Sequence, residues 1–450
     1  MNTCECAGRQ MFELAAELYP ICRSITGDGV RRTLAILQRE IPLSIHEIPT
    51  GTAVLDWTVP KEWNIRDAWV KDSRGRKIID FTRSNLHVLN YSVPVHATVS
   101  LEELKEHLFT LPEHPDWIPY RTSYYQEAWG FCLAHNQLAE LKDDRYEVWI
   151  DSSLEDGSLT LGEYLIPGEI RDEVLISSHV CHPSLANDNL SGITVAVFLA
   201  KLLQKRGSRY SYRFLFAPGT IGAIAWLAGN PDAASRVKHG LVLTCAGDSG
   251  GLTYKRSRRG TAEIDRSMAI VLRDSGSRHQ IVDFSPYGYD ERQYCSPGFN
   301  LPVGCLMRTP WGQFPEYHSS ADNLEFIQAS QLAATVDACE RLTEVLEGNQ
   351  TYRNLLPCGE PQLGRRGLYG ATGGADPEAS NLAKLWVLNL SDGEHSLLDI
   401  AERSGLPFIL LRDSARLLRA HGLLEQLEPS QLISSAGRGA AESLVLCPKI

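Results

Sequence analysis

The stretch from Glu173 to Gly192 constrains the fold more than any other part of the sequence. It opens with an apolar run that predicts a short buried strand, and this strand ends at His179. Turn-forming residues follow, with Asp188 between two asparagines, and Ile193–Leu203 then has the length and composition of a buried helix. A histidine at a strand end and a carboxylate at a helix start can meet on one metal ion at the carboxyl edge of a sheet. The alternative is that Asp188 only caps the helix.

Strand-like and helical segments alternate through the middle of the chain. Tyr212–Phe216 and Leu241–Cys245 are apolar strands with helical sequence between them, which indicates an α/β fold whose mixed central sheet is sandwiched by helices. Residues 51–125 instead hold short β-like runs broken by Gly, Pro and Asn. We therefore predict an α/β domain from residues 1–50 and 126–358, with an inserted small β-rich domain at 51–125.

The last part of the chain, residues 380–450, predicts a winged-helix domain. The expected helices and wing strands are Leu385–Leu390, His395–Ser404, Phe408–His421, Gly422–Leu427 and Ser443–Leu446. This segment has seven Lys and Arg against eight Asp and Glu, a net charge of −1, which argues against DNA binding. We expect it to pack on the α/β domain or on a second subunit of a homo-oligomer.

The composition narrows the partners and the location. The net charge of −11 at pH 7 argues against a nucleic-acid partner. No apolar run reaches the length of a membrane span, and Met1–Gln10 lacks a positive start followed by an apolar core. The eleven cysteines are scattered. We therefore expect a cytoplasmic protein with reduced thiols and no membrane partner.

Two further loops carry groups that bind metals. Asp248 follows the strand Leu241–Cys245, and His318 lies just before a predicted helix. Together with His179 and Asp188 they form a mixed nitrogen and oxygen set that is typical of a catalytic zinc. Each has a structural alternative, because Asp248 could be a turn residue and His318 a polar cap.

Four longer sequence motifs contain or accompany these residues: SSHVCHPSLANDNLSG, TIGAIAWL, DERQYCSPGFNLPVG and EYHSSADN. They resemble the zinc aminopeptidase superfamily, to which glutaminyl cyclases also belong. Within it, they are most similar to a bacterial aminopeptidase-like family of uncharacterised activity, with an inserted small domain and a C-terminal winged helix. The resemblance implies a sheet of about eight strands, with His179 and His318 as ligands, Asp188 as the bridging carboxylate and Asp248 as a further acidic ligand. It implies one zinc ion and leaves a second open.

The sequence departs from that superfamily at two places. Gly219-Thr220 stands where a pair of glutamates supplies the general base and a ligand, and Cys181 stands where an aspartate orients the first histidine. His182 is a candidate replacement ligand. The candidate replacements for the base are Glu291, which we put first, Asp290 and Glu316, and the candidate substrate-binding residues are Arg292 and Tyr317. The alternative for Asp290, Glu291 and Arg292 is a structural ion-pair turn.

These features favour a zinc-dependent hydrolase that cleaves an amide or peptide-like bond in a small substrate, within a biosynthetic pathway. A metal-dependent acyl transfer or cyclisation enzyme is the first alternative, because an amine nucleophile needs a weaker base. A catalytically degenerate scaffold that recruits partners is the second alternative. Stoichiometric zinc would separate both enzymes from a metal-free scaffold.

Overall fold

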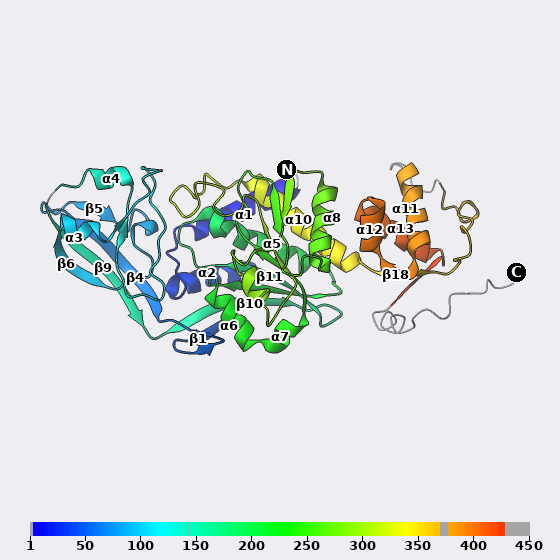
Figure 1. Cartoon of the computed structure of the whole chain (residues 1–450), viewed down its shortest axis with the longest axis horizontal. Coiled ribbons are helices and arrows are strands. Elements are labelled where there is room, and N and C mark those ends of the chain that lie inside the picture. The colour runs from blue at the N-terminus through cyan, green and yellow to red at the C-terminus, as the bar shows by residue number, and fades with distance from the viewer. Residues whose placement is uncertain (1–2, 143, 370–376, 428–450) are drawn as a thin grey trace. The chain divides into compact units, whose positions relative to one another are not determined.

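The computed structural model describes residues 3–142, 144–369 and 377–427. These residues form two compact units, Met1–Asp265 with Arg278–Glu340 and Arg266–Ser277 with Arg341–Ile450. An eight-stranded sheet with the order β1-β10-β12-β11-β13-β16-β14-β15 is the centre of the first unit (Figure 1). Its strands are β1 Ser44–Pro49, β10 Ser158–Ile166, β11 Glu173–His179, β12 Ser211–Ala217, β13 Val237–Leu243, β14 Leu252–Lys255, β15 His279–Val282 and β16 Val303–Met307.

Helices cover both faces of this sheet. The helices of this unit around the sheet are α1 Thr3–Leu18, α2 Asp28–Glu40, α5 Gly192–Leu203, α6 Ile221–Gly229, α7 Pro231–Arg236 and α9 Glu291–Tyr294. Helix α10 Ala329–Gly348 begins in this unit and ends in the second unit, and α8 Glu263–Ser275 lies mostly in the second unit. Strand β11 lies between β12 and β13 and is parallel to both. The connection from β11 to β12 therefore runs in the opposite direction to that from β12 to β13. Because such crossovers are right-handed, α5 and α6 lie on opposite faces of the sheet.

The core follows from this arrangement. Leu175 of β11, Leu215 of β12 and Val242 of β13 pack with Ile224 and Trp226 of α6 in one buried cluster. The carboxyl ends of β11 and β12 are adjacent, and their helices leave in opposite directions, which opens a crevice at that edge. The predicted α/β fold with a mixed central sheet is confirmed, including its eight strands.

A second sheet in the same unit has the order β5-β4-β9-β6. The elements of this region are β2 Ala53–Val54, β3 Trp57–Thr58, β4 Glu62–Lys71, β5 Lys77–Asp80, η1 Asn85–His87, β6 Val95–Ser100, α3 Leu101–Lys105, β7 Leu108–Phe109, β8 Phe131–Cys132, α4 His135–Ala139 and β9 Arg145–Glu155. Strand β9 pairs with both β4 and β6, so the β-rich region continues past residue 125, where we expected it to end. The apolar residues of β9 predict a strand but do not tell which sheet it joins, and we had assigned it to the α/β domain.

Besides most of α8 and the end of α10, the second unit contains a three-stranded sheet, β18-β17-β19, and further helices. Its elements are β17 Thr351–Asn354, η3 Gly364–Arg366, α11 Pro377–Leu390, β18 Asp392–Ser396, α12 Leu397–Ser404, α13 Phe408–Ala420 and β19 Leu424–Gln426. This strand and helix order is that of a winged helix. The sheet begins at β17, so the fold starts before residue 380, and the predicted wing strand Ser443–Leu446 lies outside the described residues.

Two other expectations concern the chain as a whole. None of the helices in the described ranges combines the length and the hydropathy that a bilayer crossing requires. Eight cysteines in the described part of the chain have free thiols. Cys358 is disulfide-bonded, against our expectation that the thiols are all reduced.

Candidate metal centre

His179 is the last residue of β11, at the edge of the sheet where β11 and β12 diverge. Every residue of this strand is buried, which fixes the imidazole at the crevice. The chain then runs through His182 and Ser184 to the turn η2 Ala186–Ser191, whose backbone is non-helical at Asp188 and Asn189 and which continues into α5. The strand, loop and turn thus place Asp188 next to His179, at the end of β11.

Asp188 is fully buried, and its two oxygens face different imidazoles. Oδ1 lies 3.0 Å from Nε2 of His179, and Oδ2 lies 3.0 Å from Nε2 of His318. Nε2 of His182 lies 3.8 Å from Oδ2. The hydroxyl of Tyr289 donates to Oδ1 at 3.0 Å. Four side chains from three segments therefore converge on one carboxylate.

The protonation states suit metal binding. Burial would raise the pKa of Asp188, but His182, His179 and His318 together hold it well below its ordinary value. Burial also keeps the pKa of His182 well below its ordinary value, although Asp188 opposes this. An ionised carboxylate and a neutral imidazole are the forms that coordinate zinc.

The donor set fits a zinc ion in number and kind. The ligand atoms of His179, His182 and Asp188 lie within 4.8 Å of one another. His318 completes a set of three imidazoles and one carboxylate through its contact with Asp188. Three such ligands are those of a catalytic zinc site, whose fourth position is open to water. The structure thus brings together three expected ligands and His182.

Asp322 holds the Asp188 turn in place, and we did not assign it a role from the sequence. Its carboxylate accepts the backbone N–H of Asn187 at 2.6 Å and that of Asp188 at 3.0 Å. Burial raises the pKa of Asp322 to about 8. The sequence motif EYHSSADN contains both His318 and, four residues further along, Asp322. This motif could therefore have indicated Asp322.

Aromatic side chains form one wall of the centre. The ring of Tyr317 stacks on His318 at 3.9 Å, and Tyr289 stacks on His179 at 4.8 Å. Tyr120 meets both His182 and His318, with ring centroids at 5.2 Å and 5.1 Å. These rings fix the imidazoles and shield the carboxylate from bulk water.

Asp248 is not part of this cluster, which corrects our expectation of a further acidic ligand. Its carboxylate accepts hydrogen bonds from Asn187 Nδ2 at 3.0 Å, Gly250 N at 2.7 Å, Thr309 N at 3.1 Å and Thr309 Oγ1 at 2.6 Å. These donors use both oxygens, so Asp248 joins loops. The group after β13 that faces the centre is Cys245, whose sulfur lies 3.4 Å from the hydroxyl of Tyr289.

The loop after β12 has no acidic side chain, but it has room for one. A Cβ atom on Gly219 would lie 3.6 Å from Sγ of Cys181 and 3.7 Å from Cβ of His179, which are ordinary contacts. Sγ of Cys181 accepts the N–H of Gly219 at 3.3 Å and lies 3.3 Å from Nδ1 of His182. Cys181 therefore contacts His182, while Gly219 leaves space beside His179.

Asp290 occupies the neighbourhood of this loop. Its Oδ1 accepts the N–H of Thr220 at 2.6 Å. Burial raises the pKa of Asp290 to about 6, although His179 opposes the shift. Nη2 of Arg292 donates to Oγ1 of Thr220 at 3.3 Å, and its Nε is buried without a partner among the described residues. A carboxylate with a raised pKa beside an imidazole at a crevice is suited to general-base work.

Glu291, our first choice for the base, is held elsewhere. Its Oε1 forms a buried ion pair with Nζ of Lys255 at 2.9 Å. The same ammonium donates to the carbonyls of Ser285 and Tyr287 at 2.7 Å and 2.8 Å. The Lys255–Glu291 pair thus fixes the loop that carries Tyr289. The contacts of Glu291 therefore fit the alternative of a structural ion pair better than the role of general base.

Comparison with known proteins places this centre in a family. A family model described as "Domain of unknown function (DUF4910)" matches residues 12–349, and a second, described as "winged helix-turn-helix", matches residues 350–426. A protein from Clostridium acetobutylicum, provisionally named a polysaccharide biosynthesis protein with aminopeptidase-like domain, is 54% identical over 419 residues. That alignment covers 93% of this chain and 96% of the relative.

Solved structures agree with this assignment. A crystal structure provisionally named as a peptidase from Clostridium acetobutylicum has 52% identity and a TM-score of 0.90, over 94% of this chain and 97% of that one. A zinc aminopeptidase from Bacillus subtilis has 12% identity and a TM-score of 0.57, over 76% of this chain and 94% of that one. The second likeness concerns the fold alone.

Proposed function

Because the chain belongs to the family described as "Domain of unknown function (DUF4910)", whose model spans the whole metal centre, we propose that it is a zinc-dependent hydrolase. Its target is an amide or peptide-like bond in a small substrate. The observation that carries the proposal is the convergence of His179, His182 and His318 on the buried Asp188. The fold shared with a zinc aminopeptidase and the aminopeptidase-like name of the relative support it.

His179, His182, His318 and Asp188 would hold the zinc ion. When bound, the ion polarises a substrate carbonyl and lowers the pKa of water. We propose one ion, and the two oxygens of Asp188, which face different imidazoles, could serve a second. Tyr289 donates a hydrogen bond to the Asp188 carboxylate, and Asp322 accepts one from the backbone N–H of Asp188. These two bonds hold the carboxylate and its turn in place.

Asp290 is the general base in this proposal. It lies beside Thr220, and a carboxylate whose pKa is about 6 is ionised at neutral pH and still able to take a proton from the attacking water. Arg292, next to Thr220, would bind a polar or acidic group of the substrate, and Tyr317 would form an aromatic wall beside the scissile bond.

The test is Asp290→Asn, assayed on an aminoacyl-p-nitroanilide that the wild type cleaves. We expect kcat to fall by ~10²–10⁴-fold, because the amide cannot accept the proton, with the zinc content unchanged. Activity of the wild type should rise with pH through about 6, since only ionised Asp290 is active, and the variant should lose this inflection.

Asp283→Asn is the matched control, because Asp283 is 86% exposed and pairs only with Arg256 among the described residues. Unchanged kcat in Asp290→Asn would reject Asp290 as the base. Equal losses in both variants would do the same, because the loss would then not depend on the metal centre.

One observation favours a second candidate, an acyl transfer or cyclisation enzyme. Gly219 leaves the space beside His179 without a carboxylate, and an amine nucleophile needs less help from a base than water does. Mass spectrometry of the products separates the two, since hydrolysis adds one water and transfer or cyclisation does not. The name of the relative suggests that the substrate is an intermediate of polysaccharide biosynthesis.

A further inference from the structure

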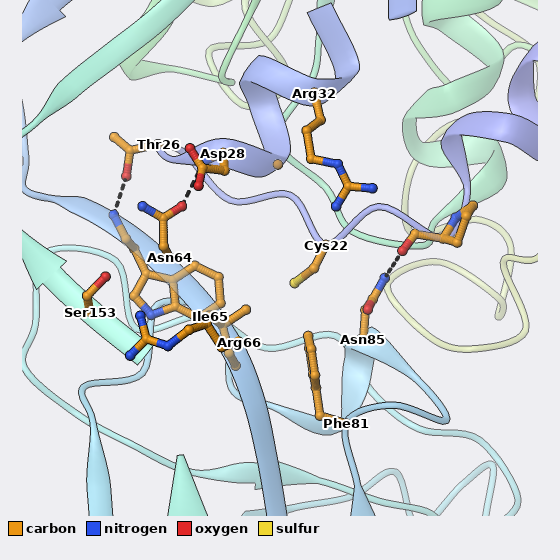
Figure 2. Close-up of a pocket in the computed structure, with 13 residues that line it drawn as sticks. Cys22, Thr26, Asp28, Arg32, Asn64, Ile65, Arg66, Phe81, Asn85 and Ser153 are labelled. Carbon is orange, nitrogen blue, oxygen red and sulfur yellow. Dashed lines mark hydrogen bonds between the residues drawn. The ribbon is translucent and has the colours of Figure 1, made fainter. Parts of the chain in front are cut away.

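A second pocket lies between the segment that leads into α2 and the second sheet (Figure 2). Its volume is about 510 Å³, within the range of small-molecule sites. The residues that line it are Pro20, Cys22, Thr26, Asp28, Gly29, Arg32, Trp63, Asn64, Ile65, Arg66, Phe81, Asn85 and Ser153. None of them is a proposed ligand, base or substrate-binding residue of the metal centre.

One cation of the pocket has no partner within the ranges that the structure describes. Arg66 is paired with Asp151 through a bidentate contact, and Asp28 shares Arg31, at 3.1 Å, with Glu47 and Glu62. Arg32 makes no ion pair or hydrogen bond with any residue that the structure describes. Figure 2 shows its guanidinium extending from α2 on the side of Cys22 and Asn85, away from Asn64. The pocket therefore offers an unneutralised charge to a ligand.

Most of the other polar groups are already satisfied. Nδ2 of Asn85 donates to the carbonyl of Pro20 at 3.0 Å and to Oγ of Ser184 at 2.8 Å. Oδ1 of Asn64 accepts the N–H of Asp28 at 2.7 Å. Oγ1 of Thr26 accepts the N–H of Trp63 at 3.0 Å. A ligand consequently finds few neutral donors and has to gain most of its polar recognition from Arg32.

The remaining surface is apolar or weakly polar. Phe81, Ile65 and Pro20 supply apolar contact, and the ring of Phe81 borders the space in Figure 2. Burial raises the pKa of the Cys22 thiol to about 12, so it stays uncharged and acts as a small apolar group. This surface matches a flat or aliphatic body attached to one anionic group.

We propose that this pocket binds a small organic anion, a carboxylate or a phosphate ester with an apolar body, whose charged group pairs with Arg32. A guanidinium recognises both anions through paired hydrogen bonds, so the shared chemistry is a planar or tetrahedral oxyanion. The site is independent of the proposed hydrolysis, because it uses none of the residues of the metal centre.

The test is calorimetric titration of the full chain with benzoate, phenyl phosphate and neutral benzamide. In the wild type, benzoate or phenyl phosphate should bind saturably and more tightly than benzamide, and the better of the two identifies the anion. Arg32→Gln should weaken that binding roughly tenfold or more, because a charge-assisted hydrogen bond is lost. Arg39→Gln, on the same helix, is the control and should bind like the wild type, since Arg39 pairs with Glu17.

Anions can also bind a metal, and the variants separate the two sites. Binding at the metal centre would survive Arg32→Gln, so equal affinity in the wild type and in this variant would overturn the proposal. Binding of benzamide as tight as that of either anion would overturn it too, as would the absence of saturable binding by both anions. Arg32 is exposed, so its replacement should leave the fold intact, which a thermal melt checks.

Discussion

At the scale of single residues, Asp188 is the group on which the metal centre depends. It is a buried carboxylate that no lysine or arginine neutralises within hydrogen-bond distance in the described structure, and three imidazoles and a phenol surround it. An ionised carboxylate in such a place is costly unless it is paired or binds a metal. The low pKa that the imidazoles impose keeps it charged and available to a cation.

Gly219→Glu tests whether the base has moved to Asp290. A Cβ at this position makes only ordinary contacts with Cys181 and His179, so the backbone tolerates a side chain there. If Asp290 is the base, we expect Gly219→Glu alone to leave kcat within about threefold or to lower it, and to restore part of the loss in an Asp290→Asn background. Initial rates on the same p-nitroanilide measure both effects. A rise of roughly a hundredfold in the single variant would mean that the wild type lacks a base.

The sequence indicated some residues of this centre and missed others for a physical reason. His179 and Asp188 could be found because a strand end and a helix start fix where they lie. Asp248 could not be placed, because a shift of a few residues after a strand decides whether a side chain faces the crevice or a neighbouring loop. Asp290 and Glu291 are adjacent, yet only Asp290 faces Thr220.

At the scale of elements, the buried Lys255–Glu291 pair fixes the segment between β15 and α9. Lys255 and Glu291 are 2% and 0% exposed, and the ammonium also binds two carbonyls of that segment. Because Tyr289 and Asp290 belong to the same segment, this pair positions both groups at the metal centre. Its role is therefore structural support for the chemistry.

Glu291→Gln should destabilise the protein by about 3–5 kcal/mol, because it leaves a buried ammonium without its counter-charge. Lys255→Met should have a similar cost, and Lys255→Met with Glu291→Leu should lie closer to the wild type than either single change. Urea unfolding followed by circular dichroism measures these differences. Single variants within about 0.5 kcal/mol of the wild type would mean that the pair does not support the segment.

The strands and helices of the α/β part were easier to predict than the limits of the β-rich region. The apolar runs within β11 and β12 identify strands that are buried along their whole length, as parallel strands are. Strand β9 alternates between exposed and buried residues, as a strand with one wet face does, but alternation does not reveal its partner. Only the pairing with β4 and β6 shows that it belongs to the second sheet.

At the scale of the whole molecule, the winged helix is the part whose role the metal centre does not explain. Its helix α13 carries three arginines, but Arg412 and Arg416 both approach Asp413, at 3.1 Å and 3.9 Å, and Arg419 donates to Gln426. The Asp413 carboxylate offsets part of the charge of Arg412 and Arg416, and the contact with Gln426 occupies one donor of Arg419 that a phosphate could use. We therefore propose that the winged helix contacts another protein.

We predict that the full chain does not bind duplex DNA selectively. Fluorescence anisotropy with a pool of labelled duplexes at about 50 and 200 mM salt measures this, and any binding should be weak and independent of sequence. Sequence-selective binding that Arg416→Gln weakens would overturn the proposal of a protein-contact module. Arg9→Gln, an exposed arginine of α1, serves as the control.

The zinc content of the purified full chain tests the central proposal most directly. Elemental analysis after zinc supplementation and dialysis should find about one zinc per chain in the wild type, because His179, His182 and Asp188 bring three ligand atoms within 4.8 Å of one another. Asp188→Asn should lose the metal, since it removes the charge on which the imidazoles converge, whereas His96→Ala, at an exposed histidine, should keep it. A wild type without zinc, or an Asp188→Asn variant that retains it in full, would contradict the assignment of this centre.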